Sequence, residues 1–506
     1  MNTRKSIYNI LSGIFGQTIS IVLGIMIPRL VIVSLGSESN GLLSSVNQIL
    51  VYLNLLESGV GTAALQALYP PVAEENRAKI NGIMAEVNHF YKKISLWYLL
   101  IISVISLLLP FIIQSELPFS TICLVVLLSG LTQAASFALQ GAYSLLIQAE
   151  GRNYILTNIR TLINIGTSIT KIILLLKGFQ LIAIQSMYCA ASLIQFIYIG
   201  HYVRKSDTWL NFSAKPDAQA LSQKNSVLIH QISGLIFQNT DVILLTFICG
   251  LKIVSVYTMY TMLFSMVATG ISTINSSVSF IMGQTYHTDR EKFMKLYNAF
   301  ETYNMALTFS LYCIAQLFIL PFLKIYTRGV TDINYIDVRL PVLFVSTYLL
   351  SNGRSAAQRI IEYAGHFRLT RNQSLTESAI NILVSSICVF KFGIYGVLFG
   401  TIAALLYRTN EMIRYASGKL LKRSSWITYR KWGSFLILYL MYQILFSNSS
   451  ICQKLTGYPV LILAAACSCL MIIPGFFILG SVIDQASFRY CRLFLMRYSN
   501  ILHKKR

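Results

Sequence analysis

The stretch ILSGIFGQTISIVLGIMIPRLVIVSLGSESNGLLSSVNQILVYLNLLESGVGTAALQALY, residues 10–69, contains two long apolar segments separated by the polar turn GSESNG at residues 36–41. Each segment exceeds the roughly 20 residues with which a helix crosses a bilayer core of about 30 Å. Each also carries a charge, Arg29 in the first and Glu57 in the second. Because a charge at membrane depth is costly, it usually faces a cavity, a partner or the interface. The stretch therefore predicts two membrane-spanning helices folded back on one another, each with a charge that faces a cavity, a partner or the interface.

The composition of the whole chain agrees with this prediction. The 506 residues are 55% hydrophobic and only 12% charged, and the mean hydropathy is +0.61. Soluble proteins carry about 25% charged residues, so the composition excludes a soluble globular protein. The basic start of the chain resembles a signal peptide, but its apolar segment is too long and lacks a cleavage site, which favours a retained first helix.

Further apolar segments follow along the chain at similar lengths. Strands need only about 10 residues to span, so segments of this length predict helices. We expect an all-α integral membrane protein with about 14 transmembrane helices. The predicted spans are residues 8–35, 41–68, 94–114, 117–147, 154–176, 179–202, 226–250, 253–283, 298–325, 338–362, 372–390, 393–416, 432–449 and 458–483.

The basic residues alternate between the loops that join these spans. About 31 of the 41 Lys and Arg residues fall in one set of loops, and about seven in the opposite set. The positive-inside rule therefore places both termini in the cytoplasm. The formal net charge of +22 is then largely an orientation signal, and nucleic acid is not an expected partner.

Landmarks recur at one offset along the chain. Gly36 and Gly250, Gly151 and Gly365, and Lys177 and Lys391 are each separated by 214 residues. This offset predicts the duplication of a six-helix unit into two parallel lobes. The alternative is coincidence among 29 glycines. The predicted division is an N-lobe at residues 1–210, a C-lobe at 211–424, and two additional helices with a basic cytoplasmic tail at 425–506.

The fifth predicted span carries a polar stripe. Arg160, Asn164, Thr167 and Lys171 follow a spacing that places them on one face of a helix. Such a face fits a water-filled cleft. Alternatively, Arg160 and Lys171 extend to the two membrane interfaces.

Other charges inside spans form the rest of the candidate site. Arg29 follows Pro28 near the outer end of the first span, Asp241 lies at a similar depth in the seventh, and Arg354 lies in the tenth. The Arg29 side chain could instead extend to the outer interface, and Glu57 could be a structural partner of a cation. An arginine fork suits phosphate because it binds two oxygens and stays protonated. We predict a cationic substrate-binding cleft of Arg29, Arg160, Lys171 and Arg354, with Glu57 and Asp241 in gating or ion coupling.

Catalytic and metal-binding motifs are missing from the sequence. There is no phosphate-binding P-loop, no HExxH and no Gly-x-Ser-x-Gly, and the six histidines do not cluster. The nine cysteines lie mostly in apolar spans, where they are typical small core residues. We therefore expect no enzyme, no cofactor and no metal site. Because the chain has no P-loop for ATP, the energy for any transport would come from an ion gradient, the membrane potential or the gradient of the substrate itself.

Several stretches resemble the bacterial polysaccharide repeat-unit flippases. In the first half these are PRL at residues 28–30, GSESNGL at 36–42, LESGVGTA at 56–63 and LYP at 68–70. In the second half they are NTD at 239–241, VSVY at 254–257, AGHFRLT at 364–370 and GIYGV at 393–397. The resemblance covers nearly the whole chain, and Arg29, Asp241 and Arg354 lie in or beside its motifs. The family belongs to the multidrug/oligosaccharidyl-lipid/polysaccharide exporter superfamily, and the resemblance implies two six-helix lobes around a central cleft with two added C-terminal helices.

This resemblance implies a function, a location and partners. It implies a flippase that moves an undecaprenyl-diphosphate-linked oligosaccharide from the cytoplasmic to the outer leaflet by alternating access, for O-antigen or capsule synthesis. The location would be the bacterial plasma (inner) membrane, with membrane lipids, a polysaccharide polymerase and glycosyltransferases as partners. The alternatives are a cation-coupled multidrug or metabolite antiporter of the same superfamily, which would need acidic cleft residues, and a membrane polysaccharide polymerase, which would need a large external loop.

Overall fold

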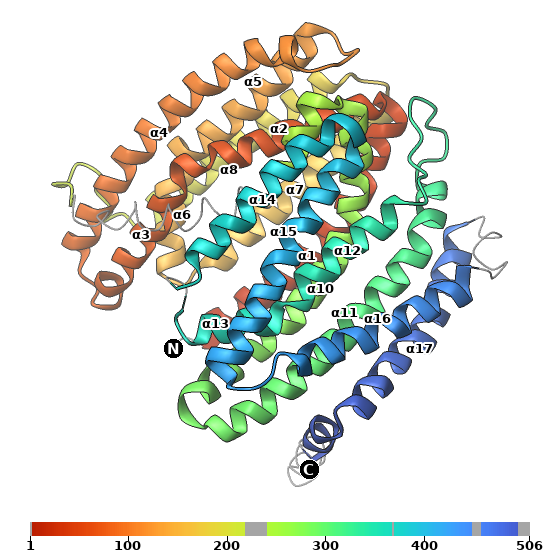
Figure 1. Ribbon diagram of the computed structural model, residues 1–506. Helices are drawn as coiled ribbons and strands as arrows, with labels where there is room; N and C mark the ends of the chain where they lie inside the picture. The colour runs from red at the N-terminus through yellow and green to blue at the C-terminus, as the bar shows by residue number, and fades with distance from the viewer. Residues whose placement is uncertain (1–2, 218–239, 367–368, 448–456, 494–506) are drawn as a thin grey trace. The chain divides into compact units, whose positions relative to one another are not determined.

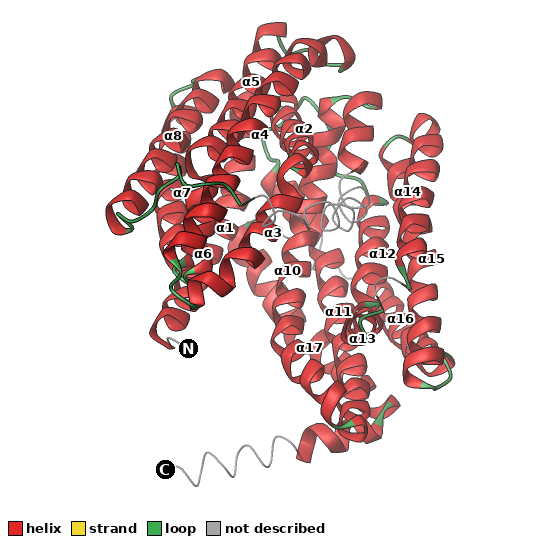
Figure 2. Cartoon of the chain, turned by 90° about the vertical axis from the view of Figure 1, so that its left-hand side faces the viewer, coloured by secondary structure: helices red, strands yellow, loops and turns green. Residues whose placement is uncertain are grey.

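The computed structural model describes residues 3–217, 240–366, 369–447 and 457–493. Every regular element in these ranges is helical, and they contain no strand (Figure 2). Nine of these helices are long and apolar enough to cross a membrane. The chain is therefore an all-helical, multi-pass membrane protein, as its sequence predicts.

The helices follow the predicted spans in chain order (Figure 1), although α4 begins at Arg77 rather than at the predicted residue 94 and α11 at Arg290 rather than at 298. They are α1 (Thr3–Leu35), α2 (Ser37–Leu53), α3 (Leu55–Ala73), α4 (Arg77–Ile112), α5 (Phe119–Ser136), η1 (Phe137–Gly141), α6 (Ala142–Ala149), α7 (Asn153–Leu176), α8 (Leu181–Ser206), α10 (Leu251–Thr288), α11 (Arg290–Tyr326), α12 (Leu340–Gly353), α13 (Ser355–Tyr363), α14 (Arg371–Phe392), α15 (Ile394–Tyr415), η3 (Ala416–Leu421), α16 (Trp426–Ser447) and α17 (Tyr458–Ile483).

Three predicted spans are interrupted helices. The span at 41–68 is divided into α2 and α3 at Asn54, and the span at 117–147 contains the π-helical turn η1 between α5 and α6. The span at 338–362 breaks at Arg354, between α12 and α13. Most of the span at 226–250 lies outside the described residues, so the count of 14 stays a prediction.

The helix boundaries repeat at the offset seen in the sequence. α2 begins at Ser37 and α10 at Leu251, each after a glycine with positive φ, 84° at Gly36 and 82° at Gly250. Glycine adopts this backbone conformation without steric cost, so it ends one helix sharply and starts the next. The interruptions also correspond, because η1 at 137–141 precedes the break at Arg354 by about the same offset. These matches support the predicted duplication.

The chain forms two compact units, residues 1–258 with 329–333, and residues 259–328 with 334–506. This boundary differs from the lobes at 1–210 and 211–424, because the start of α10 and part of a later loop pack with the first unit. The three-part division expected from the sequence stays a prediction.

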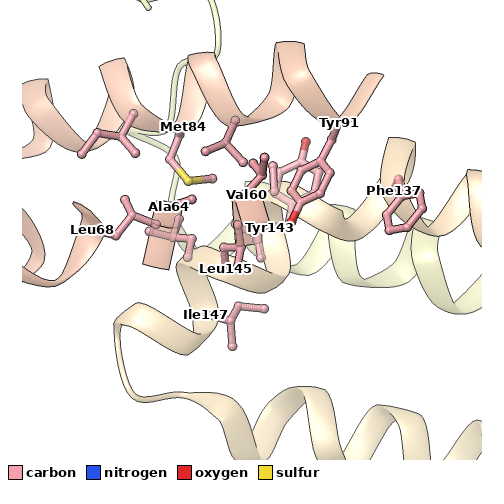
Figure 3. Packing of buried hydrophobic residues seen from close by; sticks show 14 of the residues in the cluster. Val60, Ala64, Leu68, Met84, Tyr91, Phe137, Tyr143, Leu145 and Ile147 are labelled. Atoms are coloured by element: carbon pink, nitrogen blue, oxygen red, sulfur yellow. The ribbon is translucent and has the colours of Figure 1, made fainter. Parts of the chain in front are cut away.

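The first unit contains a dense apolar core where α3, α4 and α6 meet (Figure 3). Val60, Ala64 and Leu68 of α3 pack against Met84 of α4 and Leu145 of α6, and all five side chains are buried. Apolar residues three and four apart place one face of each helix inward.

The second unit contains a buried charge cluster that joins α16 and α17 to α11. The Glu301 carboxylate of α11 accepts from Arg423 at 2.5 Å and from Lys431 of α16 at 3.0 Å. Lys431 also contacts Asp484, directly after α17, at 3.0 Å. Because Glu301 and Lys431 are each only 2% exposed, loss of one partner would leave a buried charge unpaired. The basic tail expected after α17 lies largely outside the described residues.

Candidate functional site

Helix α7 exposes two opposite faces, and one of them is the predicted polar stripe. Arg160 and Asn164 are exposed, Lys171 is half-buried, and Thr167 is buried with its hydroxyl donating to the Ile163 carbonyl. The opposite face exposes the apolar side chains of Leu162, Ile169, Ile173 and Leu176. The apolar face suits lipid, whereas the polar face would be costly in lipid and suits water.

Lys171 also contacts the neighbouring helix α8. Its ammonium lies 5.5 Å from the centre of the Tyr188 ring, a cation–π distance. Arg29 lies on α1, which packs against α7, and its side chain is half-buried. The first unit therefore carries Arg29, Arg160 and Lys171 on two adjacent helices.

In the second unit, α10 exposes a stripe of hydroxyl groups. Thr269, Ser272, Thr273, Ser276 and Ser277 are exposed and lie on one side of the helix. The hydroxyls of Thr269 and Thr273 donate to carbonyls four residues earlier, so each oxygen keeps acceptor capacity. This stripe was not among the predicted site residues, although its 3–4 residue spacing is visible in the sequence.

Arg354 pairs with a buried carboxylate. It donates to Glu377 of α14 at 2.7 Å, and the two side chains are 11% and 7% exposed. Glu377 also lies 3.6 Å from Arg408 of α15, which pairs with Glu411 at 2.5 Å. A phosphate that binds Arg354 would therefore have to share this arginine with Glu377 or displace the Glu377 carboxylate.

The two acidic candidates each accept from a tyrosine. Glu57 of α3 accepts from the Tyr91 hydroxyl at 2.7 Å. Asp241 is 7% exposed and accepts from the Tyr257 hydroxyl at 2.8 Å. Both residues belong to the first unit.

A seam of hydroxyl and amide groups joins α2 to α10 and to the segment just before α10. Asn40 donates to Ser255 at 2.8 Å, the hydroxyls of Ser45 and Thr246 lie 2.7 Å apart, and Ser44 donates to Thr258 at 3.4 Å. Ser44 and Thr258 are 214 residues apart, so equivalent positions of the two repeats touch one another. We call these contacts the α2–α10 seam.

The seam is packed without space for side-chain growth. A Cβ at Gly41 would lie 1.9 Å from the carbonyl oxygen of Leu251, so the two backbones touch directly. Asp332, from the loop after α11, accepts from the backbone N–H of Ser37 at 2.7 Å and from its hydroxyl at 2.8 Å. A carboxylate at a helix N-terminus satisfies free N–H groups and complements the helix dipole. The sequence predicted a polar turn at 36–41, but only Gly36 separates α1 from α2, and residues 37–41 already belong to α2. The partners of Ser37 were not predicted.

Comparison with known proteins identifies the fold. No protein-family profile and no curated protein sequence matches the chain. Among solved structures, the lipid II flippase MurJ in an inward closed conformation superposes with a TM-score of 0.70 at 13% identity, covering 94% of this chain and 99% of MurJ.

Two drug transporters share the fold as well. An inward-facing multidrug resistance MATE family transporter of the MOP superfamily gives a TM-score of 0.63 at 14% identity, covering 79% of this chain and 95% of the transporter. The MATE multidrug transporter DinF-BH, solved in a complex, gives a TM-score of 0.53 at 14% identity, with 81% and 94% covered. The chain therefore has the fold of these membrane transporters and flippases, as the resemblance in its sequence implies.

Proposed function

We propose that this protein is a flippase that moves undecaprenyl-diphosphate-linked oligosaccharide repeat units from the cytoplasmic to the outer leaflet by alternating access. The observation that carries the proposal is the cationic face of α7, Arg160 to Lys171, in a membrane-spanning helix of a MurJ-like fold. Cell-surface polysaccharide such as O-antigen or capsule would be the product of the pathway.

The chemistry of this substrate matches the polar faces. Both phosphates carry negative charge, and their transfer through bare hydrocarbon would be prohibitive. Arg29, Arg160, Lys171 and Arg354 would replace lost hydration, with arginine forks on the phosphate oxygens. Hydroxyl groups such as those on α10 suit the sugars, which offer matching donors and acceptors.

The α2–α10 seam would serve as the outer gate. With both termini in the cytoplasm, the N-terminal ends of α2 and α10 lie at the outer surface. The seam consists of small hydroxyl contacts, and each neutral hydrogen bond contributes only about 1 kcal/mol. Such a seam can close tightly and still separate. Glu57 and Asp241, each bonded to a tyrosine, would act in gating or ion coupling.

We also propose a location and partners for this protein. The protein would lie in the bacterial inner membrane, work with membrane lipids and receive substrate from glycosyltransferases. A polysaccharide polymerase would use the product on the outer side. We propose neither a cofactor nor an enzymatic reaction for this chain.

The alternative function is a cation-coupled multidrug or metabolite antiporter. The observations in its favour are the fold shared with MATE transporters and the acidic residues Glu57 and Asp241. The prevalence of cations over carboxylates on the exposed polar face of α7 favours an anionic substrate instead. A polysaccharide polymerase has no structural observation in its favour.

A gene deletion tests the proposal. We expect the deletion strain to accumulate a lipid-linked oligosaccharide in the cytoplasmic leaflet and to lose one surface glycan, and expression of the gene in trans should reverse both. Unchanged surface glycans together with hypersensitivity to organic cations would refute the proposal and support the antiporter.

A further inference from the structure

A concavity of about 740 Å³ lies at the end of α15 and along η3, in the second unit. Its polar wall contains Arg414, Lys419, Tyr415 and Asn410, and its apolar edge is formed by Leu406 and Tyr407. Leu406 and Tyr407 are 46% and 36% exposed, so the concavity borders a surface suited to lipid. A ligand that fits it would be polar at one end and apolar at the other.

The polar wall carries a net positive charge. Arg414 and Lys419 are exposed, and no ion pair among the described residues involves either of them. The concavity also contains Glu411, but its carboxylate lies 2.5 Å from the buried Arg408. The charge of Glu411 is therefore balanced from inside the helix bundle, and the two outer cations remain to attract an anion.

Neighbouring side chains hold the wall in place. The Lys419 ammonium lies 5.1 Å from the centre of the Tyr415 ring, and the Tyr415 hydroxyl lies 2.9 Å from Nδ1 of His366. Asn410 accepts from the Tyr429 hydroxyl of α16 at 2.8 Å. These contacts limit the conformations that must be lost when a ligand binds.

The duplicated fold does not require a cation at the position of Arg414. At the offset of 214 residues, Arg408 corresponds to Ile194 and Glu411 to Ile197, which are 65% and 61% exposed on α8. Arg414 corresponds to Gly200. Lys419 corresponds to Lys205, which is also exposed, so of the two cations only Arg414 is particular to the second repeat.

We propose that this concavity binds the phosphate headgroup of an anionic phospholipid, with Arg414 and Lys419 on the phosphate and the acyl chains along Leu406 and Tyr407. Basic pockets at the cytoplasmic ends of membrane helices suit such headgroups. The ligand is a bulk membrane lipid rather than the diphosphate of a transported lipid, because the concavity adjoins exposed apolar side chains and not the hydroxyl stripe of α10. This inference is independent of the proposed function.

The test measures retained lipid by native mass spectrometry of the full chain, after incubation with phosphatidylglycerol or phosphatidylcholine. Each basic contact to an anionic surface contributes about 1 kcal/mol, so R414Q/K419Q should weaken phosphatidylglycerol binding about 30-fold. The charge-conserving R414K/K419R should retain binding, which would show that R414Q/K419Q alters the site and not the fold. The control K177Q/K391Q removes two exposed cations at the C-terminal ends of α7 and α14, away from the concavity. It should bind phosphatidylglycerol as the unmodified protein does.

Three results would overturn the proposal. The first is equal phosphatidylglycerol binding by R414Q/K419Q and K177Q/K391Q. The second is equal binding of phosphatidylcholine and phosphatidylglycerol by the unmodified protein. The third is displacement of bound phosphatidylglycerol by one equivalent of undecaprenyl diphosphate, which would assign the site to the transported lipid.

Discussion

Substitution of Gly41 by alanine should open the α2–α10 seam. The new Cβ would lie 1.9 Å from the Leu251 carbonyl oxygen and 2.7 Å from the carbonyl carbon, and both are backbone atoms that cannot rotate away. Overpacking of this kind costs about 1–3 kcal/mol. Because the clash exists only while the seam is closed, a cost of about 2 kcal/mol should raise the open population about 30-fold.

The assay uses a cysteine at Ser45, whose side chain is 0% exposed in the closed seam. In a background without the nine native cysteines, a membrane-impermeant maleimide should label S45C/G41A about 30-fold faster than S45C. Labelling should occur from the outer side of the membrane.

A matched control separates gate opening from general damage. A Cβ at Gly270 of α10 meets no atom within 4 Å, so S45C/G270A should label at the rate of S45C. Equal labelling of S45C and S45C/G41A, or an equal rise in S45C/G270A, would refute the reasoning.

Three further predictions concern the charged residues. R354Q should lower the melting temperature because Glu377 loses its closest partner. R354Q/E377Q should restore stability but not surface glycan. Recovery of both stability and surface glycan would make the role of Arg354 purely structural. R160Q and K171Q should each slow transport in vesicles at least tenfold. K177Q, at the exposed end of the same helix, should leave the transport rate unchanged. Equal rates in all three variants would remove Arg160 and Lys171 from the site. E301Q should destabilise the fold by about 3–5 kcal/mol in denaturation experiments. E291Q, which removes one partner of an exposed pair with Lys295, should destabilise it by less than about 1 kcal/mol. Similar losses in the two variants would contradict the anchoring role of Glu301.

The helical architecture and the repeat could be predicted from the sequence because both are local or periodic signals. Apolar length marks a spanning helix, and Gly36 and Gly250 mark where equivalent helices start. The interruption at Arg354 was missed because hydropathy shows which residues are polar but not where a helix is broken, and the predicted span ran through this arginine.

The partners of the site residues could not be predicted in the same way. Arg354 finds Glu377 on a different helix, and Asp332 reaches Ser37 across 295 residues of sequence. Such pairs depend on how helices pack, and periodicity describes only one helix at a time. The polar stripe lies on a single helix, α7, and so could be predicted from the spacing of its residues. The α2–α10 seam joins two separate segments and could not.

The most direct test of the account measures transport with the seam locked. The Ser44 and Thr258 hydroxyl oxygens lie 3.4 Å apart, which places cysteines there within reach of a disulfide. In proteoliposomes, S44C/T258C should move a fluorescent undecaprenyl-diphosphate-linked oligosaccharide when reduced, stop when oxidised, and resume after reduction. The same rate in both redox states, or no movement of the lipid-linked glycan in either, would contradict the account.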